Sequence, residues 1–550
     1  MSEAMGGAGV PEGAGDGPGG NADASGAAAA YGADGGSPEE AVAFTLNHRQ
    51  IMIVLPGLLM AMLLAMLDQL IVGTALPRIV GSLGGVSHLS WVVTAYILAA
   101  TITTPFYGKL GDMYGRKKFF VAAIVIFLAG SALAGLSTSM AQLIIFRTIQ
   151  GLGAGGLIVG AMATIGEIVP PRERGRYISY FMVVMMLATI GGPLVGGWIT
   201  DAFSWRWIFY INLPLGGAAL VYLIATLHLP ARRVEHRIDY LGGALLGIVS
   251  TAVILVATWG GTEYGWASAP VVALVAVAVV ALVAFIAVER RAAEPSLPLH
   301  VCKNRNFSVT MALAFFVGLG LFGAMTFLPL YQQTVQGASP TVSGLLMTPL
   351  MVGSAITSVV AGIAVTKTGR YKMFPIIGGA GMAVGMFLLT KLGVSTTRLQ
   401  TGIDFVILGF GMGCLMQMVS LIAQNSVGLK DMGVASSARM FFQQMGGSLG
   451  VAAFGALFAS RLNAAMGAGA PGGAQFHVSG QFDPAMVKSL PPEVQHTVFN
   501  AIAHAVQGVF TWVTPAAVLL FVLALFIKEV PLRGRAPSAE KPAPEAELVG

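Results

Sequence analysis

The 550-residue chain has very few charged residues. Asp, Glu, Lys and Arg make up 10% of it, 55% of the residues are hydrophobic, and the mean hydropathy is +0.77. Soluble domains carry about 25% charged residues, so this composition excludes a soluble protein of this size. A helix needs roughly 20 apolar residues to cross a bilayer core. Fourteen apolar stretches come close to that length, near 51–76, 89–108, 119–137, 142–166, 177–199, 207–227, 240–259, 269–288, 308–330, 341–365, 373–392, 403–424, 438–460 and 508–527. The sequence therefore predicts an all-α polytopic membrane protein.

Cysteine is nearly absent as well. Cys302 falls in a predicted loop and Cys414 in a predicted span, so we expect no disulfide framework. The first 50 residues are rich in Gly and Ala and have no apolar core, which excludes a cleavable signal peptide and favours a disordered tail.

The sequence also has no P-loop, no cluster of metal ligands and no nucleophile–base constellation. We therefore expect no enzyme activity, no metal, no cofactor, and an ion gradient rather than ATP as the energy source.

The net charge of +6 reflects topology rather than a nucleic-acid partner. Of the 31 Lys and Arg residues, 23 fall on one side of the predicted spans and six on the other, while Arg147 and Arg439 fall inside spans. The positive-inside rule places the basic side in the cytoplasm. Both termini then lie in the cytoplasm, as an even number of spans requires. We expect a multi-pass protein of the cell (plasma) membrane and no binding of nucleic acid.

An internal repeat divides the chain into two halves. Residues 108–118 and 362–372 share their Gly, Gly-Arg and Lys positions and follow the second span of each half, although Thr366 replaces Asp112. Duplicated halves are a known plan of secondary transporters. The predicted organisation is a cytoplasmic tail at 1–50, a six-helix bundle at 51–227, a linker with two extra helices at 228–307, a second six-helix bundle at 308–527 containing a long extracellular loop at 461–506, and a cytoplasmic tail at 528–550.

Five segments together resemble a known family. They are residues 67–77 in the first span, 108–118, 147–153 in the fourth span, 192–197 in the fifth span and 205–214 before the sixth. The chain from about residue 50 to 533 resembles the major facilitator superfamily, and within it the fourteen-span drug:proton antiporters of the EmrB/QacA type. One departure is Gln443, where that group often carries Arg.

This resemblance implies a fold and a function. The implied fold is the major facilitator fold, two six-helix bundles with two extra helices between them. The implied function is proton-coupled antiport that exports amphipathic or lipophilic small molecules by alternating access, that is, multidrug efflux. A dedicated exporter of one secondary metabolite or lipid, working by the same mechanism, is the alternative. The residues implied to form a cytoplasmic gate are Gly108, Asp112, Gly115, Arg116 and Lys118, and those of the antiporter motif are Gly192, Pro193, Gly196 and Gly197.

Asp68 is the residue that we expect to carry protons. It lies well inside the first span, where an ionised carboxylate costs about 2.5–3.5 kcal/mol on insertion scales. Hydrocarbon disfavours the charged form of a carboxyl group, whereas water or a neighbouring Arg stabilises it. A carboxyl group whose surroundings alternate can therefore bind a proton on one side and release it on the other. Arg147, the basic residue deep in the first half, is the expected modulator. For both residues a purely structural role, with the side chain held by neighbours, is the alternative.

Two further patterns have competing interpretations. Residues 151–156 match G-x-G-x-x-G, but that nucleotide-binding motif needs a preceding strand, so we interpret the glycines as helix-packing positions in the bilayer. The 27 Met and 29 Phe suit a cavity for varied apolar ligands, although lipid-facing packing accounts for most of them. We expect a small-molecule substrate, protons and the lipid bilayer as partners of a monomer, and the need for a membrane-fusion partner stays open. The residues expected to bind cargo are Gln332, Gln417, Gln424 and Gln443.

Overall fold

The computed structural model describes residues 48–85, 88–169, 174–227, 240–260, 264–291, 299–428, 432–468 and 492–531. Most of the predicted tails and residues 228–239 of the linker lie outside these ranges. Within them the secondary structure is helical, apart from one isolated bridge between Gly260 and Tyr264. The helices are α1 (His48–Leu83), α2 (Leu89–Tyr114), α3 (Arg116–Leu136), α4 (Met140–Ile168), α5 (Arg174–Ala202), α6 (Trp207–Tyr210), α7 (Asn212–Thr226), α8 (Tyr240–Trp259), α9 (Ala269–Glu289), α10 (Leu299–Cys302), α11 (Arg305–Thr334), α12 (Pro340–Thr368), α13 (Met373–Leu389), α14 (Arg398–Asn425), α15 (Met432–Ala468) and α17 (Pro492–Leu525).

Among the described residues, twelve helical segments are long and apolar enough to cross a membrane, by length and composition. Two shorter apolar segments, Leu89–Thr104 and Met373–Leu389, fall at the second and eleventh predicted stretches. Each of the fourteen predicted stretches thus coincides with a helix, which confirms the all-α membrane fold class. The sixth stretch is divided at Ile211 into α6 and α7.

The sequence repeat appears as a repeat of structure. Gly115 ends α2 with a φ of 100°, and its N–H donates to the carbonyl of Gly111. Gly369 ends α12 with a φ of 74°, and its N–H donates to the carbonyl of Val365. A residue with a Cβ rarely adopts such φ values. The shared glycine therefore lets the chain turn sharply at the equivalent place in both halves.

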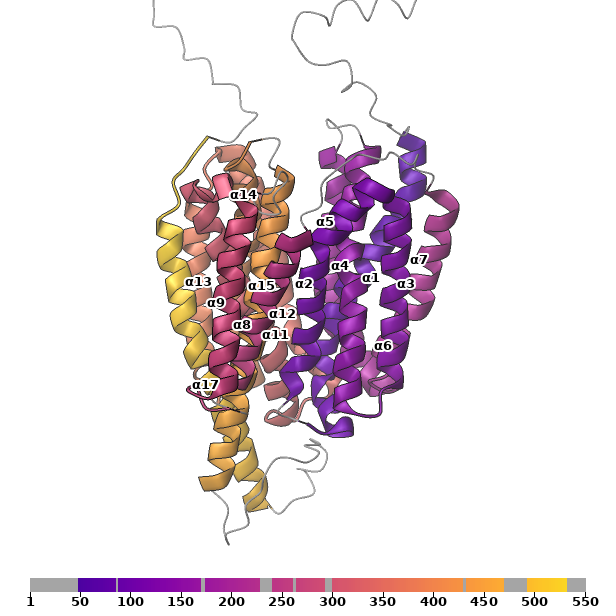
Figure 1. Cartoon of the computed structure of the whole chain (residues 1–550). Helices are drawn as coiled ribbons and strands as arrows, with labels where there is room; N and C mark the ends of the chain where they lie inside the picture. Colours follow the sequence, from indigo (N-terminus) through magenta and orange to yellow (C-terminus); the bar gives the residue numbers. More distant parts are fainter. Residues whose placement is uncertain are drawn as a thin grey trace, which may run out of the picture. The chain divides into compact units, whose positions relative to one another are not determined.

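The helices form two bundles (Figure 1). In the first, α4 packs against α2 and α3, and α1 packs against α5 and α7; in the second, α14 packs against α12 and α13, and α11 packs against α15 and α17. The pair α8 and α9 belongs to neither bundle. Helix α8 contacts α2 of the first bundle and α15 of the second, while α9 packs mainly on α8 and exposes valines such as Val280 and Val283.

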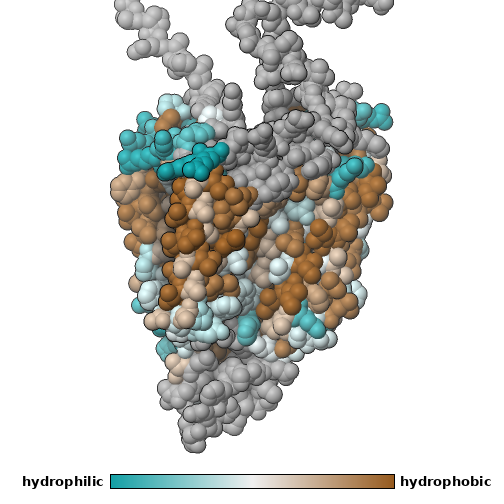
Figure 2. Space-filling view, in the orientation of Figure 1, coloured by the Kyte–Doolittle hydropathy of each residue, from teal (hydrophilic) through white to brown (hydrophobic). Residues whose placement is uncertain are grey.

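The surface is apolar where a bilayer would surround it. Figure 2 shows brown, hydrophobic side chains over the middle of the visible face and teal, hydrophilic ones toward its ends. Large exposed side chains include Val221 of α7, Ile356 of α12 and Trp512 of α17. In water such a surface would aggregate, whereas lipid tails solvate it.

The two bundles meet mainly through the helix pairs α5 with α12, α2 with α15, and α1 with α11. A Cβ placed on Gly197 of α5 would lie 2.2 Å from the carbonyl oxygen of Pro340, and one on Gly344 of α12 would lie 2.3 Å from that of Pro193. Such distances exclude any side chain. The glycines therefore bring the backbones of α5 and α12 into direct contact.

The expected loop at 461–506 is shorter than the sequence indicated. Helix α15 continues to Ala468, and α17 already begins at Pro492. The added turns of α17 are amphipathic, since Val498, Ile502 and Val506 are buried on one face. An amphipathic segment is less apolar on average than a lipid-exposed span. Residues 469–491, with the loop's Pro471, Pro484 and Pro491, lie outside the described part.

Candidate functional site

The expected proton carrier and its modulator form a buried ion pair. The side chains of Asp68 on α1 and Arg147 on α4 are each 1% exposed, and Arg147 NH1 lies 2.6 Å from Asp68 Oδ2. Because neither charge reaches the surface of the protein, each depends on its partner and its hydrogen bonds for stabilisation. The two residues singled out from the sequence are thus brought together, 79 positions apart.

The second carboxylate oxygen of Asp68 is held by two amides. Gln150 Nε2 donates to Asp68 Oδ1 at 2.8 Å, and Asn212 Nδ2 donates to the same oxygen at 2.7 Å. Both amides also contact Ser131 Oγ, at 3.1 and 2.9 Å. Ser131 in turn donates to the carbonyl of Phe209 at 2.9 Å. Every donor stabilises the charged form of Asp68, and together they tie α1, α3, α4 and α7 to one carboxylate.

The guanidinium of Arg147 is equally well surrounded. Its Nε donates to the carbonyl of Val92 at 3.2 Å, and NH1 also donates to Gln150 Oε1 at 2.8 Å. Its central carbon lies 4.0 Å above the ring of Tyr96, a cation–π contact, and the Tyr96 hydroxyl donates to the carbonyl of Ala65.

Sequence reasoning placed Gln150 and Asn212 only within family-like segments. It missed Ser131 and Tyr96, for which the sequence carries no separate signal.

The expected cytoplasmic gate is described only in part. Gly108 and Asp112 lie within α2, and the side chain of Asp112 lies outside the described part of the chain. Arg116 begins α3, where its Nε lies 3.3 Å from Glu167 Oε2 and NH1 donates to the carbonyl of Ala163, both on α4. Lys118 is exposed. The contacts of Arg116 therefore join α3 to α4 within the first bundle.

The antiporter-motif glycines lie at helix contacts of α5. A Cβ on Gly192 would lie 2.7 Å from Leu70 Cβ, and one on Gly196 would lie 2.7 Å from the carbonyl oxygen of Ile71, both on α1. Gly197 and Pro193 face α12, as described above. The motif thus places α5 against one helix of each bundle. By contrast, a Cβ on Gly191 would meet no atom within 4 Å.

The four glutamines expected to bind cargo do not form one site in this conformation. Gln332 is fully buried, and its Oε1 accepts from Ser343 of α12 at 2.8 Å. Gln417 and Gln424 lie two turns apart on one face of α14. Gln424 Nε2 donates to Ser436 of α15 at 3.1 Å, and Gln443 accepts from Arg439 at 2.6 Å. Gln332 therefore contributes to the contact between α11 and α12. Gln417 and Gln424 lie on α14, and Gln443 lies on α15.

One group of polar contacts between the bundles lies toward the ends of α1, α5 and α11 and the start of α12. Asp201 Oδ2 accepts from the backbone N–H of Thr341 at 2.8 Å and from its hydroxyl at 2.5 Å. Gln333 Nε2 donates to the carbonyl of Thr74 at 2.7 Å. These contacts hold the two bundles together at the end opposite the basic connections.

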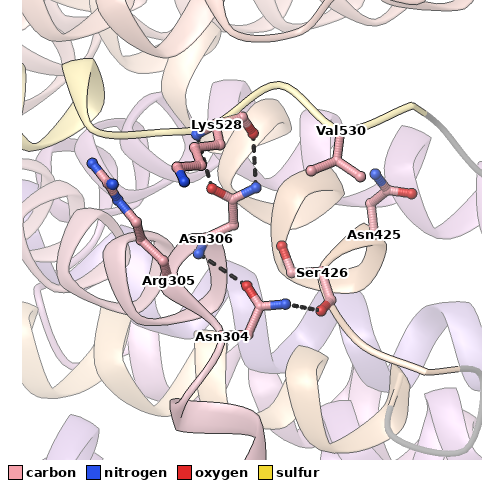
Figure 3. Close-up of a pocket in the computed structure, with 7 residues that line it drawn as sticks. All are labelled: Asn304, Arg305, Asn306, Asn425, Ser426, Lys528 and Val530. Carbon is pink, nitrogen blue, oxygen red and sulfur yellow. Dashed lines mark hydrogen bonds between the residues drawn. The ribbon is translucent and has the colours of Figure 1, made fainter.

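A cavity of about 310 Å³ lies at the other end of the second bundle (Figure 3). Asn306 exchanges two hydrogen bonds with the backbone of Lys528, Nδ2 donating to its carbonyl at 2.7 Å and Oδ1 accepting from its N–H at 2.9 Å. The hydroxyl of Tyr371 donates to the same carbonyl and accepts from the N–H of Val530. The lining contains none of the predicted site residues, and consists of Asn304, Arg305, Asn306, Asn425, Ser426, Lys528 and Val530.

Comparison with known proteins identifies the relatives of this chain. Residues 58–451 match the family described as "Major Facilitator Superfamily". The chain is 41% identical over 480 residues to an uncharacterised MFS-type transporter of Mycobacterium tuberculosis, covering 87% of this chain and 70% of the relative. It is 34% identical over 508 residues to "Multidrug resistance protein 3" of Bacillus subtilis, covering 90% and 99%. A crystal structure of a bacterial homologue of the human lysosomal transporter Spinster has the same fold, with a TM-score of 0.63, 13% identity, and 88% and 98% of the two chains covered.

Proposed function

The chain belongs to the Major Facilitator Superfamily of membrane transporters, and from that premise we propose that it exports amphipathic or lipophilic small molecules in exchange for protons. The relative from Bacillus subtilis that it covers almost completely is named for multidrug resistance. We further propose that the chain belongs to the fourteen-span drug:proton antiporters, with α8 and α9 as the two extra helices. It would act as a monomer in the plasma membrane, with both termini in the cytoplasm.

The buried Asp68–Arg147 pair is the observation that supports coupling to protons. A carboxylate inside a membrane span is costly and in transporters usually marks an ion pathway. Here the charged carboxylate is stabilised by Arg147, Gln150 and Asn212. Protonation of Asp68 would remove the ion pair and leave the donors of Arg147 and the amides with a weaker acceptor. The energy of this network therefore depends on whether Asp68 carries a proton, as coupling requires.

The contacts between the bundles support alternating access. With the basic connections in the cytoplasm, the α5–α12 contact and the Asp201–Thr341 hydrogen bonds lie on the extracellular side. In that orientation the contacts between the bundles would close the protein to the extracellular side. We propose that binding of a proton at Asp68 and release of cargo accompany separation of these helices, and that residues 108–118 hold the opposite side closed in the alternative state.

Efflux from cells or inverted vesicles tests this proposal. We would measure transport of a lipophilic fluorescent dye by the wild type and by Asp68→Asn, with and without a proton uncoupler. Asp404→Asn is the matched control, because Asp404 lies in α14, outside the Asp68 network. We expect the uncoupler and Asp68→Asn to abolish efflux equally, and Asp404→Asn to retain it.

Two results would change the proposal. Normal efflux by Asp68→Asn would show that Asp68 does not carry the proton. No efflux of any tested dye by the wild type would favour the second candidate, a dedicated exporter of one secondary metabolite or lipid.

A further inference from the structure

Arg439 is a second arginine inside a membrane helix, and its surroundings differ from those of Arg147. It lies two turns after the start of α15. Its NH1 donates to Gln443 Oε1 at 2.6 Å, one turn further along the same helix. Its Nε is buried and has no hydrogen-bond acceptor among the described residues. Within the described ranges no carboxylate lies within 4.0 Å of Arg439.

The missing acceptor and counter-charge of Arg439 call for an explanation. Arg147 has a carboxylate at 2.6 Å, a carbonyl at its Nε and an aromatic ring against its face. Buried charges in membrane proteins are usually paired in this way, and those that are not lie on substrate or ion pathways. Arg439 has one neutral acceptor in place of a counter-charge. The side chain of Arg439 is only partly buried, so a ligand can reach the guanidinium, and among the described residues no carboxylate compensates its charge.

The neighbours of Arg439 are polar and include residues expected to contact cargo. Ser436, Arg439 and Gln443 follow one another at spacings of three and four residues, so they share a face of α15. Ser436 is hydrogen-bonded to Gln424 of α14. The next residue of α15, Gln444, accepts from Thr101 of the first bundle at 2.9 Å. This polar face therefore lies beside the interface of the bundles, where the proposed cargo would pass.

We propose that Arg439 binds the carboxylate of an amphipathic, anionic cargo molecule, with Gln443 holding the guanidinium in place. This proposal rests on the export function proposed above and narrows its substrate class. The guanidinium offers five N–H donors in a plane, and a carboxylate can accept two of them at once. The buried Nε would then gain the acceptor that it lacks. The apolar body of the cargo would lie against the apolar cluster around the neighbouring Ala438, which contains Phe307 and the adaptable Met311.

A pair of probes that differ only in charge tests this assignment. We would measure binding of 11-(dansylamino)undecanoic acid and of its methyl ester to the full-length protein in lipid nanodiscs, by dansyl fluorescence. We expect the wild type to bind the acid about tenfold more tightly than the ester, the size of a charge-assisted hydrogen bond. In Arg439→Gln the affinity for the acid should fall to that for the ester, while the affinity for the ester stays unchanged.

The control variants separate charge recognition from structure. Arg461→Gln removes an exposed arginine from the same helix and should bind both probes as the wild type does. Arg439→Lys keeps the charge without the planar donors and should retain part of the preference. If Arg439→Gln does not fold, the comparison of acid and ester on the wild type and on Arg439→Lys still decides the question.

Equal affinity of the wild type for the two probes would overturn the proposal, and so would an equal loss of both probes in Arg439→Gln. Binding needs no proton gradient, so the measurement is independent of Asp68. If Asp68→Asn transports normally but the wild type prefers the acid, proton coupling through Asp68 fails and the carboxylate site stands.

Discussion

The ion pair between Asp68 and Arg147 predicts a large energetic coupling between the two residues. Asp68→Asn leaves the guanidinium of Arg147 buried without a counter-charge, and it turns an amide NH₂ toward the donors that now contact the carboxylate. Arg147→Gln leaves the carboxylate with its two amide donors but no cation. Removing one partner of a buried pair costs about 3–5 kcal/mol. Each single variant should be destabilised by an amount in this range.

The double variant should be more stable than the sum of the single effects predicts. Asp68→Asn with Arg147→Gln leaves no uncompensated charge, and its two amides can hydrogen-bond to each other. Contacting residues show interaction energies of up to about 3 kcal/mol, and full burial of this pair at 2.6 Å places it near the upper end. We therefore expect the double variant to lose about 2–3 kcal/mol less than the sum of the single losses.

Unfolding of the purified protein in mixed micelles, followed by circular dichroism as the fraction of denaturing detergent rises, gives the four free energies. A second cycle, Asp404→Asn with Arg147→Gln, serves as the control, since these side chains belong to different bundles. The control cycle should be additive. If the Asp68–Arg147 cycle were also additive within about 0.5 kcal/mol, the two side chains would not be energetically coupled. The argument that the energy of the network depends on the proton of Asp68 would then fail.

Three further predictions concern other parts of the chain. Gly197→Ala should abolish transport or folding because its Cβ would lie 2.2 Å from a backbone carbonyl, whereas Gly191→Ala should behave as the wild type in the same efflux assay. Asp201→Asn should weaken the bond to Thr341 by about 1 kcal/mol, the difference between a charged and a neutral acceptor, and separate α5 from α12 more often, measured as a longer distance between spin labels on these helices. Burial raises the pKa of the Tyr371 hydroxyl above its ordinary value of 10.0. The unfolded chain therefore ionises first, so stability should fall as the pH rises above about 10, and Tyr371→Phe should reduce that fall in a pH series of thermal unfolding.

The sequence predicted the helices better than their contacts. Apolar length alone located the helices, since bilayer thickness fixes how many residues a span needs. The repeat predicted equivalent turns, and Gly115 and Gly369 have positive φ at those positions. Loop length was predicted poorly: the first turns of α17 are stabilised by packing on one face, which an average hydropathy underestimates.

The candidate site was predictable only where a residue was out of place in a membrane. Asp68 and Arg147 stood out because charge is costly there, and they proved to be partners. Ser131 and Tyr96 are ordinary residues for a span, and their roles arise from the rotation of each helix, which tertiary packing determines. Gln332 looked like a cargo residue for its polarity alone. Its Oε1 accepts from Ser343, a contact between helices that sequence spacing does not reveal, and its role in cargo binding stays a prediction.

The backbone after α17 has a practical consequence for work with this protein. Lys528 and Val530 connect the end of the last helix to Asn306, at the start of the first helix of the second bundle, and to Tyr371 between α12 and α13. The six helices of this bundle are thereby joined in a ring, closed by hydrogen bonds rather than by covalent linkage. A truncation or a fused reporter placed before residue 528 would open that ring, whereas one placed beyond residue 531 would leave it intact. Affinity tags and fluorescent fusions at the C-terminus should therefore keep everything up to residue 531.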